Sequence, residues 1–267
     1  KKSPDSSGTA QSYSDQGVLN TRNLFFQSLG SNGRSCITCH QPDQGWSVTP
    51  AGIQKRFDDT KGQDPIFRTN DGSVSPNADI STVDARRQAF RMLLSKGLIR
   101  VGIAIPTTAE FELAAVDDPY GYASSGELSL FRRPLPATNL RFLTTVMWDG
   151  RESAPNATLQ ENLIRQALDA TQGHAQLAGK LNATQLNEIV RFEKGLTTSQ
   201  ATDEHTGKLN THGGKGGPIN LHHAKFFIGI NDPLGTNAPF NPNAMTLFNA
   251  WQKPGKNPKD PARAAVY

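Results

Sequence analysis

Apolar residues recur at helical spacing in four stretches of the chain. The stretches run from Gly17 to Gly30, from Ser81 to Gly97, from Thr158 to Ala170 and from Thr184 to Lys194. The second and third open on capping-box sequences, and a glycine follows or closes the first, second and fourth, as is typical of helix ends. The pattern predicts four amphipathic helices.

The remaining segments carry weaker patterns. Apolar and other residues alternate from Ile99 to Ile105, and Phe111 and Leu113 repeat the alternation, which predicts a short two-stranded hairpin. Residues 41–79 are rich in Asp, Gly, Pro, Ser and Asn and are expected to form a long loop. Beyond residue 197 the chain turns polar and glycine-rich, with a last helix expected near residues 244–251.

The two cysteines of the chain belong to one pentapeptide, Cys36-Ile37-Thr38-Cys39-His40. Two thiols separated by two residues can each add to one vinyl group of a porphyrin, and a histidine directly after them can bind the iron. The motif therefore predicts one covalent haem c, with Cys36 and Cys39 as tethers and His40 as the proximal ligand. In the predicted fold, residues 41–79 lie over this haem.

Two other kinds of site use a Cys-x-x-Cys pair. A redox-active pair follows a strand and opens a helix, whereas here Gly30 and Gly33 precede the pair and Pro42 follows it. A structural zinc site needs four ligands at closed spacing, and the chain has neither a second Cys-x-x-Cys nor a His-x-His pair. Both alternatives are therefore disfavoured.

Taken together, the patterns predict a mainly α protein with a class I cytochrome c-like haem domain. This domain is expected to span residues 1–197, with long loops and the hairpin inserted at about 47–135. Residues 198–267 are expected to form a C-terminal arm or a linker. The predicted helix at 184–194 lies where a closing helix crosses the first helix in a cytochrome c fold.

Charge and hydropathy narrow the class of partner. The net charge is +4 and the sequence pI is near 9.1, but Lys and Arg are scattered, which gives nucleic-acid binding little support. The chain has no run of 18 or more apolar residues, so no membrane-spanning helix is predicted. Because c-type haem is attached outside the cytoplasm, we expect a periplasmic or secreted protein whose signal peptide has been removed.

Four ordered motifs resemble the N-terminal haem half of bacterial di-haem cytochrome c peroxidases and their MauG-type relatives. The motifs are Cys36–His40 after Leu29–Gly33, Arg133–Leu140, Trp148–Arg151 and Gln166–Ala167. The resemblance covers roughly residues 17–197. It implies a haem that reacts with peroxide and Trp148 as an electron relay to a second haem. That second haem receives electrons from a small donor or a redox partner protein, or oxidises a substrate at a distance. It also implies a calcium ion near Asn139.

Trp148 and Asn139 have plainer interpretations. Without the resemblance, Trp148 would be a core tryptophan beside an ion pair of Asp149 and Arg151. An isolated asparagine is a weak indication of a calcium site.

The chain departs from this family on the distal side of the haem. Where the peroxidases carry a glutamate that moves a proton, this chain has His174 and Gln176, and an amide cannot transfer a proton. His174 could act as the acid-base group, bind the iron, or be an ordinary surface histidine. The sixth iron position is then open, filled by water or taken by His174, with Met147 next in line.

A second departure is the absence of a second Cys-x-x-Cys-His motif. Either the chain is part of a longer di-haem protein, which its C-terminal sequence favours, or it works with one haem, alone or as a homodimer. The leading hypothesis is a haem oxidoreductase of the peroxidase type, with His174, Gln176 and Trp148 as candidate catalytic residues. The alternative is an electron-transfer cytochrome without catalytic activity, and a structural or sensor haem has no feature in its favour.

Overall fold

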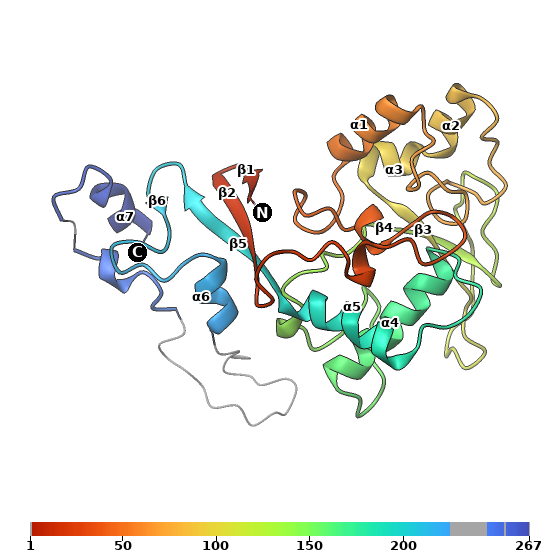
Figure 1. Ribbon diagram of the computed structural model, residues 1–267. Coiled ribbons are helices and arrows are strands. Elements are labelled where there is room, and N and C mark those ends of the chain that lie inside the picture. The colour runs from red at the N-terminus through yellow and green to blue at the C-terminus, as the bar shows by residue number, and fades with distance from the viewer. Residues whose placement is uncertain (1, 225–244, 254, 267) are drawn as a thin grey trace. The chain divides into compact units, whose positions relative to one another are not determined.

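The computed structural model describes residues 2–224, 245–253 and 255–266 (Figure 1). The chain divides into two compact units, each built from separated segments. We call residues 1–19, 138–144 and 192–267 the sheet unit, and residues 20–137 and 145–191 the motif unit, because the latter contains the Cys-x-x-Cys-His sequence. The predicted division at residue 197 stays a prediction.

The sheet unit is built on a four-stranded antiparallel sheet of order β1-β2-β5-β6. Its strands are β1 (Lys2–Asp5), β2 (Gly8–Ser14), β5 (Leu196–Asp203) and β6 (Gly207–Lys208). Hydroxyl pairs join the two central strands: the Oγ1 atoms of Thr9 and Thr202 lie 2.6 Å apart, and Ser12 Oγ lies 2.8 Å from Thr198 Oγ1. These cross-strand contacts stabilise strands that have few apolar side chains.

Short helices complete the described part of the sheet unit. They are α6 (Pro218–His223), α7 (Asp260–Val266) and two 3₁₀ turns, at Leu140–Phe142 and Asn249–Trp251. The helix expected at residues 244–251 begins outside the described residues, and its described part contains only the 3₁₀ turn at Asn249–Trp251. Trp251 is buried, and its indole N–H donates to the carbonyl of Thr211.

One apolar cluster in the motif unit gathers the elements that follow the cysteine motif. The elements are α1 (Pro50–Thr60), α2 (Val83–Ala89), α3 (Arg91–Lys96) and the first residue of β3 (Ile99–Ile103). Buried aromatic rings form its centre, with Phe67 contacting both Phe57 and Phe90. Cys39 packs against this cluster, so the core directly supports the motif.

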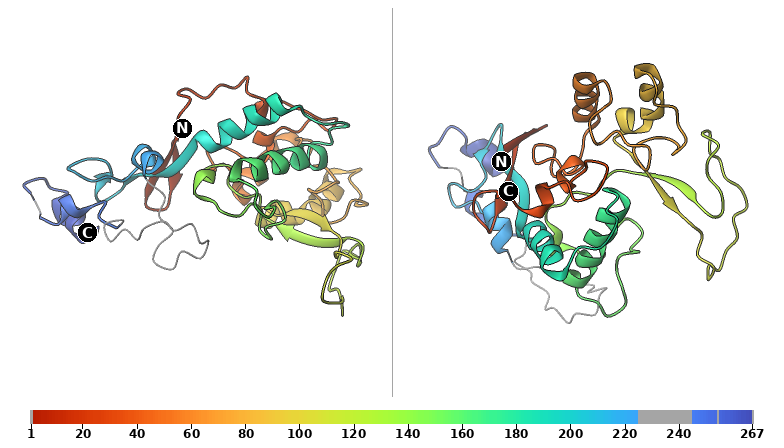
Figure 2. Two further views of the ribbon diagram at one scale, coloured as in Figure 1. Left: turned by 90° about the horizontal axis from the view of Figure 1, so that it is seen from below. Right: turned by 45° about the vertical axis from the view of Figure 1, so that its right-hand side comes forward.

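The structure confirms two long helices that the sequence predicted, α4 (Leu159–Gly173) and α5 (Ala183–Gly195). The capping box that opens α4 is present: Thr158 Oγ1 accepts the Glu161 amide at 3.3 Å, and Glu161 Oε2 accepts the Thr158 amide at 2.7 Å. Within the motif unit, α4 lies beside the first part of α5 (Figures 1 and 2), and Gln160 donates to Asn187 between them.

The second predicted helix is present in two pieces. α2 and α3 meet at Phe90. α3 ends at Lys96, and the φ of 68° at Gly97 makes it the left-handed cap that the sequence predicted. The hairpin is also present, but β3 pairs with β4 (Leu128–Arg132) rather than with residues near Phe111. The strand that pairs with β3 lies further along the sequence than predicted, because residues 104–127 form a long connection between the two strands (Figure 2).

Two predictions about helices are wrong. Residues 17–30 contain only a 3₁₀ turn at Leu24–Phe26, because Asn23 Oδ1 accepts the Phe25 amide and competes with helical bonding. Residues 50–60, expected to be loop, form α1. Thr49 Oγ1 caps the Gly52 amide and Pro50 is the first helical residue, and only Ile53 and Phe57 are buried, which is too few for the periodicity to stand out.

The predicted fold class is corrected as well. The protein is 32% helical and 14% strand with two small sheets, so it is a mixed α/β fold and not a mainly α, class I cytochrome c-like domain. The error arises from the sheet unit, whose strands are rich in Ser, Thr and Gln and give no apolar alternation. No helix in the described ranges has both the length and the apolar character to cross a membrane, as expected.

Candidate functional site

The cysteine motif forms a single tight turn. Cys36–Thr38 is a 3₁₀ helix, and the amides of Cys39 and His40 both donate to the Cys36 carbonyl, at 3.1 and 3.0 Å. The Ser35 amide donates to Thr38 Oγ1 at 3.0 Å and so fixes the start of the turn. Both cysteines are half-buried and lie within one turn of His40.

The electrostatics of Cys39 argue against a redox-active thiol. Burial raises the pKa of the Cys39 thiol to about 11, because the charged thiolate would lose its hydration. Reactive thiols in redox motifs instead have lowered pKa values, which favour the nucleophilic thiolate. At neutral pH Cys39 is therefore a neutral thiol packed against the apolar cluster.

His40 is held in one tautomer by the loop that follows it. Its Nδ1 lies 3.0 Å from the Trp46 carbonyl oxygen, and because a carbonyl only accepts, Nδ1 carries the hydrogen. Burial lowers the pKa of His40, although the Trp46 and Leu135 carbonyls oppose the shift, so the ring is neutral near pH 7. Nε2 then keeps its lone pair, as a metal-binding imidazole requires.

A second segment, Gly173–Gln176, is bound to the residues that precede the cysteines. Asn32 Nδ2 donates to the His174 carbonyl at 2.7 Å, and the amide and hydroxyl of Ser31 both donate to the Gln176 carbonyl. The two candidate distal residues therefore lie next to the motif, although they are more than 130 positions away in sequence. Gln176 is exposed, with a φ of 57°, and it contributes its backbone carbonyl to these contacts.

The His174 ring is oriented by a buried ion pair. His174 Nδ1 lies 2.6 Å from Asp71 Oδ2, while Asp71 Oδ1 lies 2.5 Å from Arg34 NH1. Burial alone would raise the pKa of Asp71, but the hydrogen bond from His174 and the charge of Arg34 outweigh it, and the pKa is lowered. Asp71 is thus an ionised acceptor, and the His174 side chain remains 42% exposed.

The two imidazoles belong to one electrostatic site. Positive charge on His174 lowers the pKa of His40 through space. Each ring has its Nδ1 engaged, one by the Trp46 carbonyl and the other by Asp71. In their neutral forms both rings therefore present an Nε2 lone pair.

Gly30 permits the close approach of the two segments, and replacing it should separate them. A Cβ at this position would lie 1.8 Å from the Ala175 carbonyl oxygen, so Gly30→Ala must displace the backbone. We expect a loss of about 1–3 kcal/mol in the free energy of unfolding, measured by chemical denaturation. Gly179→Ala is the matched control, since nothing lies within 4 Å of its added methyl. Equal stability of the two variants would contradict the close approach.

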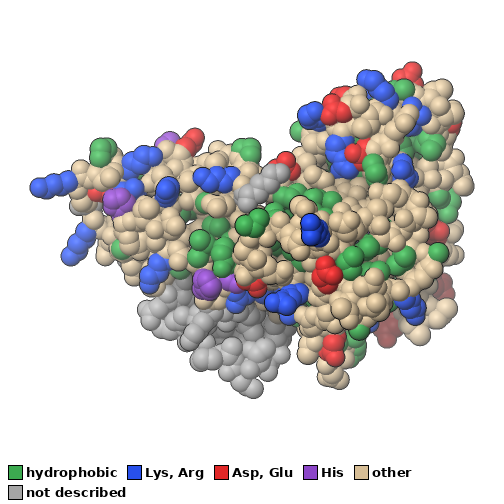
Figure 3. Space-filling view, viewed as in Figure 1, with side chains coloured by type: hydrophobic (Ala, Val, Ile, Leu, Met, Phe, Trp, Pro, Cys, Tyr) green, Lys and Arg blue, Asp and Glu red, His purple; other side chains and the backbone are tan. Residues whose placement is uncertain are grey.

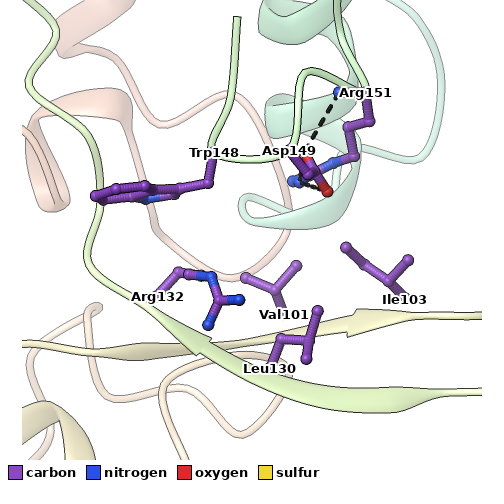
Figure 4. Close-up of a pocket in the computed structure, with 7 residues that line it drawn as sticks. All are labelled: Val101, Ile103, Leu130, Arg132, Trp148, Asp149 and Arg151. Atoms are coloured by element: carbon purple, nitrogen blue, oxygen red, sulfur yellow. Dashed lines mark hydrogen bonds and ion pairs between the residues drawn. The ribbon is translucent and has the colours of Figure 1, made fainter.

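Trp148 lies on the surface of the motif unit and is not a core residue. Its side chain is 60% exposed, and its indole N–H donates to the Arg133 carbonyl at 3.1 Å. It borders a hollow of about 390 Å³ whose floor is the face of the β3–β4 hairpin (Figure 4). The neighbouring ion pair is present, with Arg151 NH1 3.0 Å from Asp149 Oδ1.

Asn139, the candidate calcium ligand, lies in the sheet unit. Its Oδ1 accepts a hydrogen bond from the Thr198 backbone amide at 2.9 Å, and its Nδ2 donates to the Thr198 carbonyl at 2.8 Å. The oxygen and the nitrogen of the Asn139 side chain are therefore both bound to β5. Across the described ranges, no three or more His, Cys, Asp or Glu side chains gather as a metal-ion site. Met147, the other candidate for the sixth iron position, is half-buried with a φ of 72°.

Sequence reasoning did not identify Arg34 and Asp71. Asp71 belongs to Asn70-Asp71-Gly72, which is typical of an exposed turn, yet its side chain is only 7% exposed. Arg34 is equally enclosed and also donates to the carbonyls of Pro65 and Ile66. Only the fold brings these charges together, and no spacing rule links positions 34, 71 and 174.

Comparison with known proteins did not add a relative. No family model, no curated protein and no solved structure matches the chain.

Proposed function

We propose that the protein is a c-type haem oxidoreductase that reacts with peroxide or another oxidant. In this proposal Cys36 and Cys39 tether the haem, and His40 binds its iron through Nε2. The observation that carries the proposal is the turn that holds both thiols beside His40, with His40 Nδ1 engaged by the Trp46 carbonyl and with the His174 segment bound to Asn32 just before the cysteines.

The residues of the chain have distinct roles in this proposal. A bound haem supplies the redox-active iron at which an oxidant takes up electrons. His174 accepts a proton from a peroxide substrate at Nε2 and returns it to the departing oxygen, the role that glutamate has in the resembled family. Gln176 supplies a carbonyl that anchors the His174 segment, and Phe25 packs against His40 with ring centroids 6.2 Å apart.

Electrons reach the site from outside the chain. Reduction of peroxide to water consumes two electrons and two protons, so a redox partner protein or a small donor is required. Trp148 is the proposed relay, and its 60% exposure makes it accessible to a second haem domain, a second copy of the chain or a donor. On the face shown in Figure 3, Lys and Arg are dispersed rather than gathered in a stripe, and we propose no nucleic-acid partner. A periplasmic location follows from covalent haem.

The proposal predicts a coloured protein with a covalently attached ring. The protein, exported by an added periplasmic signal peptide in a host that attaches haem c, should gain the mass of one haem and keep its colour after acid–acetone extraction. A Cys36→Ser/Cys39→Ser variant should lose both properties. The reduced wild type should then be reoxidised by hydrogen peroxide, and Trp148→Phe should slow turnover with a macromolecular donor. A colourless wild type with both thiols alkylatable would refute the proposal.

A second candidate function is electron transfer without catalysis. The observation in its favour is that His174, fixed by Asp71 with Nε2 available, has the tautomer that an axial iron ligand needs, while Gln176 cannot move a proton. Electron paramagnetic resonance separates the two functions, because low-spin iron that becomes high-spin in His174→Gln indicates a carrier. High-spin iron in the wild type indicates a site open to an oxidant.

A further inference from the structure

The arrangement of Arg34, Asp71 and His174 is more elaborate than a structural ion pair needs to be. Arg34 and Asp71 have side chains only 2% and 7% exposed, and burying them costs several kcal/mol in hydration. Arg34 uses the rest of its guanidinium on the Pro65 and Ile66 carbonyls, and NH1 also reaches the His174 carbonyl at 3.2 Å. One buried charge thus holds both the carboxylate and the backbone of the histidine.

The carboxylate oxygens have separate partners. Oδ1 accepts from Arg34 and Oδ2 accepts from His174 Nδ1 at 2.6 Å, the short distance expected for a charge-assisted hydrogen bond. A hydrogen bond to an ionised group contributes about 1.5–3 kcal/mol, which is a preference of roughly 10- to 150-fold. In the neutral ring this preference selects the tautomer with hydrogen on Nδ1.

The backbone around His174 is held equally firmly. Gly173 accepts from Asn70 Nδ2 at 3.1 Å, and Asn70 is the residue directly before Asp71. Asn32 donates to the His174 carbonyl from the segment that leads into the cysteines. The ring is therefore fixed from two loops, while its side chain remains 42% exposed.

We infer that Asp71 is a positioning residue that fixes the tautomer and direction of His174, so that Nε2 presents its lone pair to the haem site, with Arg34 holding the carboxylate in place. This inference rests on the proposed function for the identity of the group that Nε2 meets. The tautomer itself does not depend on haem. The two can therefore be tested separately.

The test is long-range ¹H–¹⁵N correlation NMR on the full-length protein labelled in histidine. The sample is reduced under carbon monoxide, which makes any haem iron diamagnetic, and is held at pH 9, well above the ordinary histidine pKa of about 6.5. Loss of one signal in His174→Gln assigns the ring. We expect the wild type to favour hydrogen on Nδ1 by at least about tenfold.

The decisive variant is Arg34→Met/Asp71→Leu, which replaces both charges with apolar groups and so avoids leaving one of them buried alone. We expect its Nδ1 preference to fall to about twofold or less. The matched control is Asp260→Leu/Arg263→Met, which removes another buried ion pair, with 2.9 Å between Arg263 NH1 and Asp260 Oδ1, in the sheet unit. The control should keep the wild-type ratio.

The wild-type spectrum decides the inference even if the variant does not fold. Hydrogen on Nε2 of His174 in the wild type, a doubly protonated ring at pH 9, or an unchanged tautomer ratio in a folded double variant would each overturn it. A colourless protein that shows the expected tautomer would refute the haem proposal and leave the role of Asp71 standing. A haem-containing protein with hydrogen on Nε2 of His174 would leave the haem proposal standing and refute the role of Asp71.

Discussion

Arg34→Met should destabilise the protein by about 3–5 kcal/mol, measured as the free energy of unfolding in urea. The substitution removes the charge that lies 2.5 Å from Asp71 Oδ1, together with the hydrogen bonds to the Pro65 and Ile66 carbonyls. Asp71 is then left as a buried carboxylate whose remaining charge partner is His174. An uncompensated buried charge is costly because its hydration is lost without a replacement.

The matched control for Arg34→Met is Lys55→Met. Lys55 also pairs with an aspartate, Asp59, at 2.6 Å, but the two side chains are 75% and 57% exposed. Exposed pairs four residues apart on a helix contribute about 0.3–0.5 kcal/mol. Arg34→Met/Asp71→Leu should recover most of the stability that Arg34→Met loses. If Arg34→Met and Lys55→Met cost the same, burial of the Arg34–Asp71 pair is refuted.

The second large effect is a pH dependence that arises from Glu193. Its side chain lies in the sheet unit with the residue only 6% exposed, and within the described part of the chain its Oε2 has no hydrogen-bond partner. Burial raises the pKa of Glu193 from 4.5 to about 8, because the charged form cannot be hydrated there. In the folded protein this carboxyl is therefore protonated over most of the neutral range.

Stability should fall as the pH rises through this range. Above pH 4.5 the unfolded chain releases the Glu193 proton while the folded chain keeps it. The contribution of Glu193 to the free energy of unfolding is therefore full below pH 4.5, and it is lost as the pH rises to the folded pKa of about 8. The loss amounts to about 4 kcal/mol. Glu193→Gln cannot ionise and should lack this slope.

Denaturation of wild type and Glu193→Gln at pH 4.5 and pH 8 measures the effect. The stability of the variant relative to wild type should increase by about 4 kcal/mol between the two conditions. Glu204→Gln serves as the control, because Glu204 is exposed in the same unit and should give parallel curves. If Glu193→Gln also runs parallel to wild type, Glu193 is ionised in the folded protein.

Local signals in the sequence predicted the parts of the fold that depend on neighbouring residues. The capping box at Thr158, the glycine stop at Gly97 and the alternation from Ile99 each correspond to an observed element. The signals failed where distant residues decide the structure. β2 is a strand because it pairs with β5, and the sequence from Gly8 to Ser14 has no pattern that predicts this pairing.

The candidate site divides in the same way. Cys36, Cys39 and His40 are adjacent in sequence, so their grouping could be read directly. That His174 lies near them could be proposed from the family resemblance. Its orientation could not, because it depends on a carboxylate 103 positions away that reads as part of a turn. Charges buried by the fold leave no periodic pattern in the sequence.

The pairing of β2 with β5 also constrains how the protein is made. Hydroxyl partners on these strands are separated by as many as 193 positions, as for Thr9 and Thr202. Closing so long a loop has a large entropic cost before any contact offsets it, and folds with such non-local pairing form slowly. Synthesis must therefore reach Asp203, about three-quarters of the way along these 267 residues, before β2 can pair with all of β5, and until then this polar strand has no partner strand.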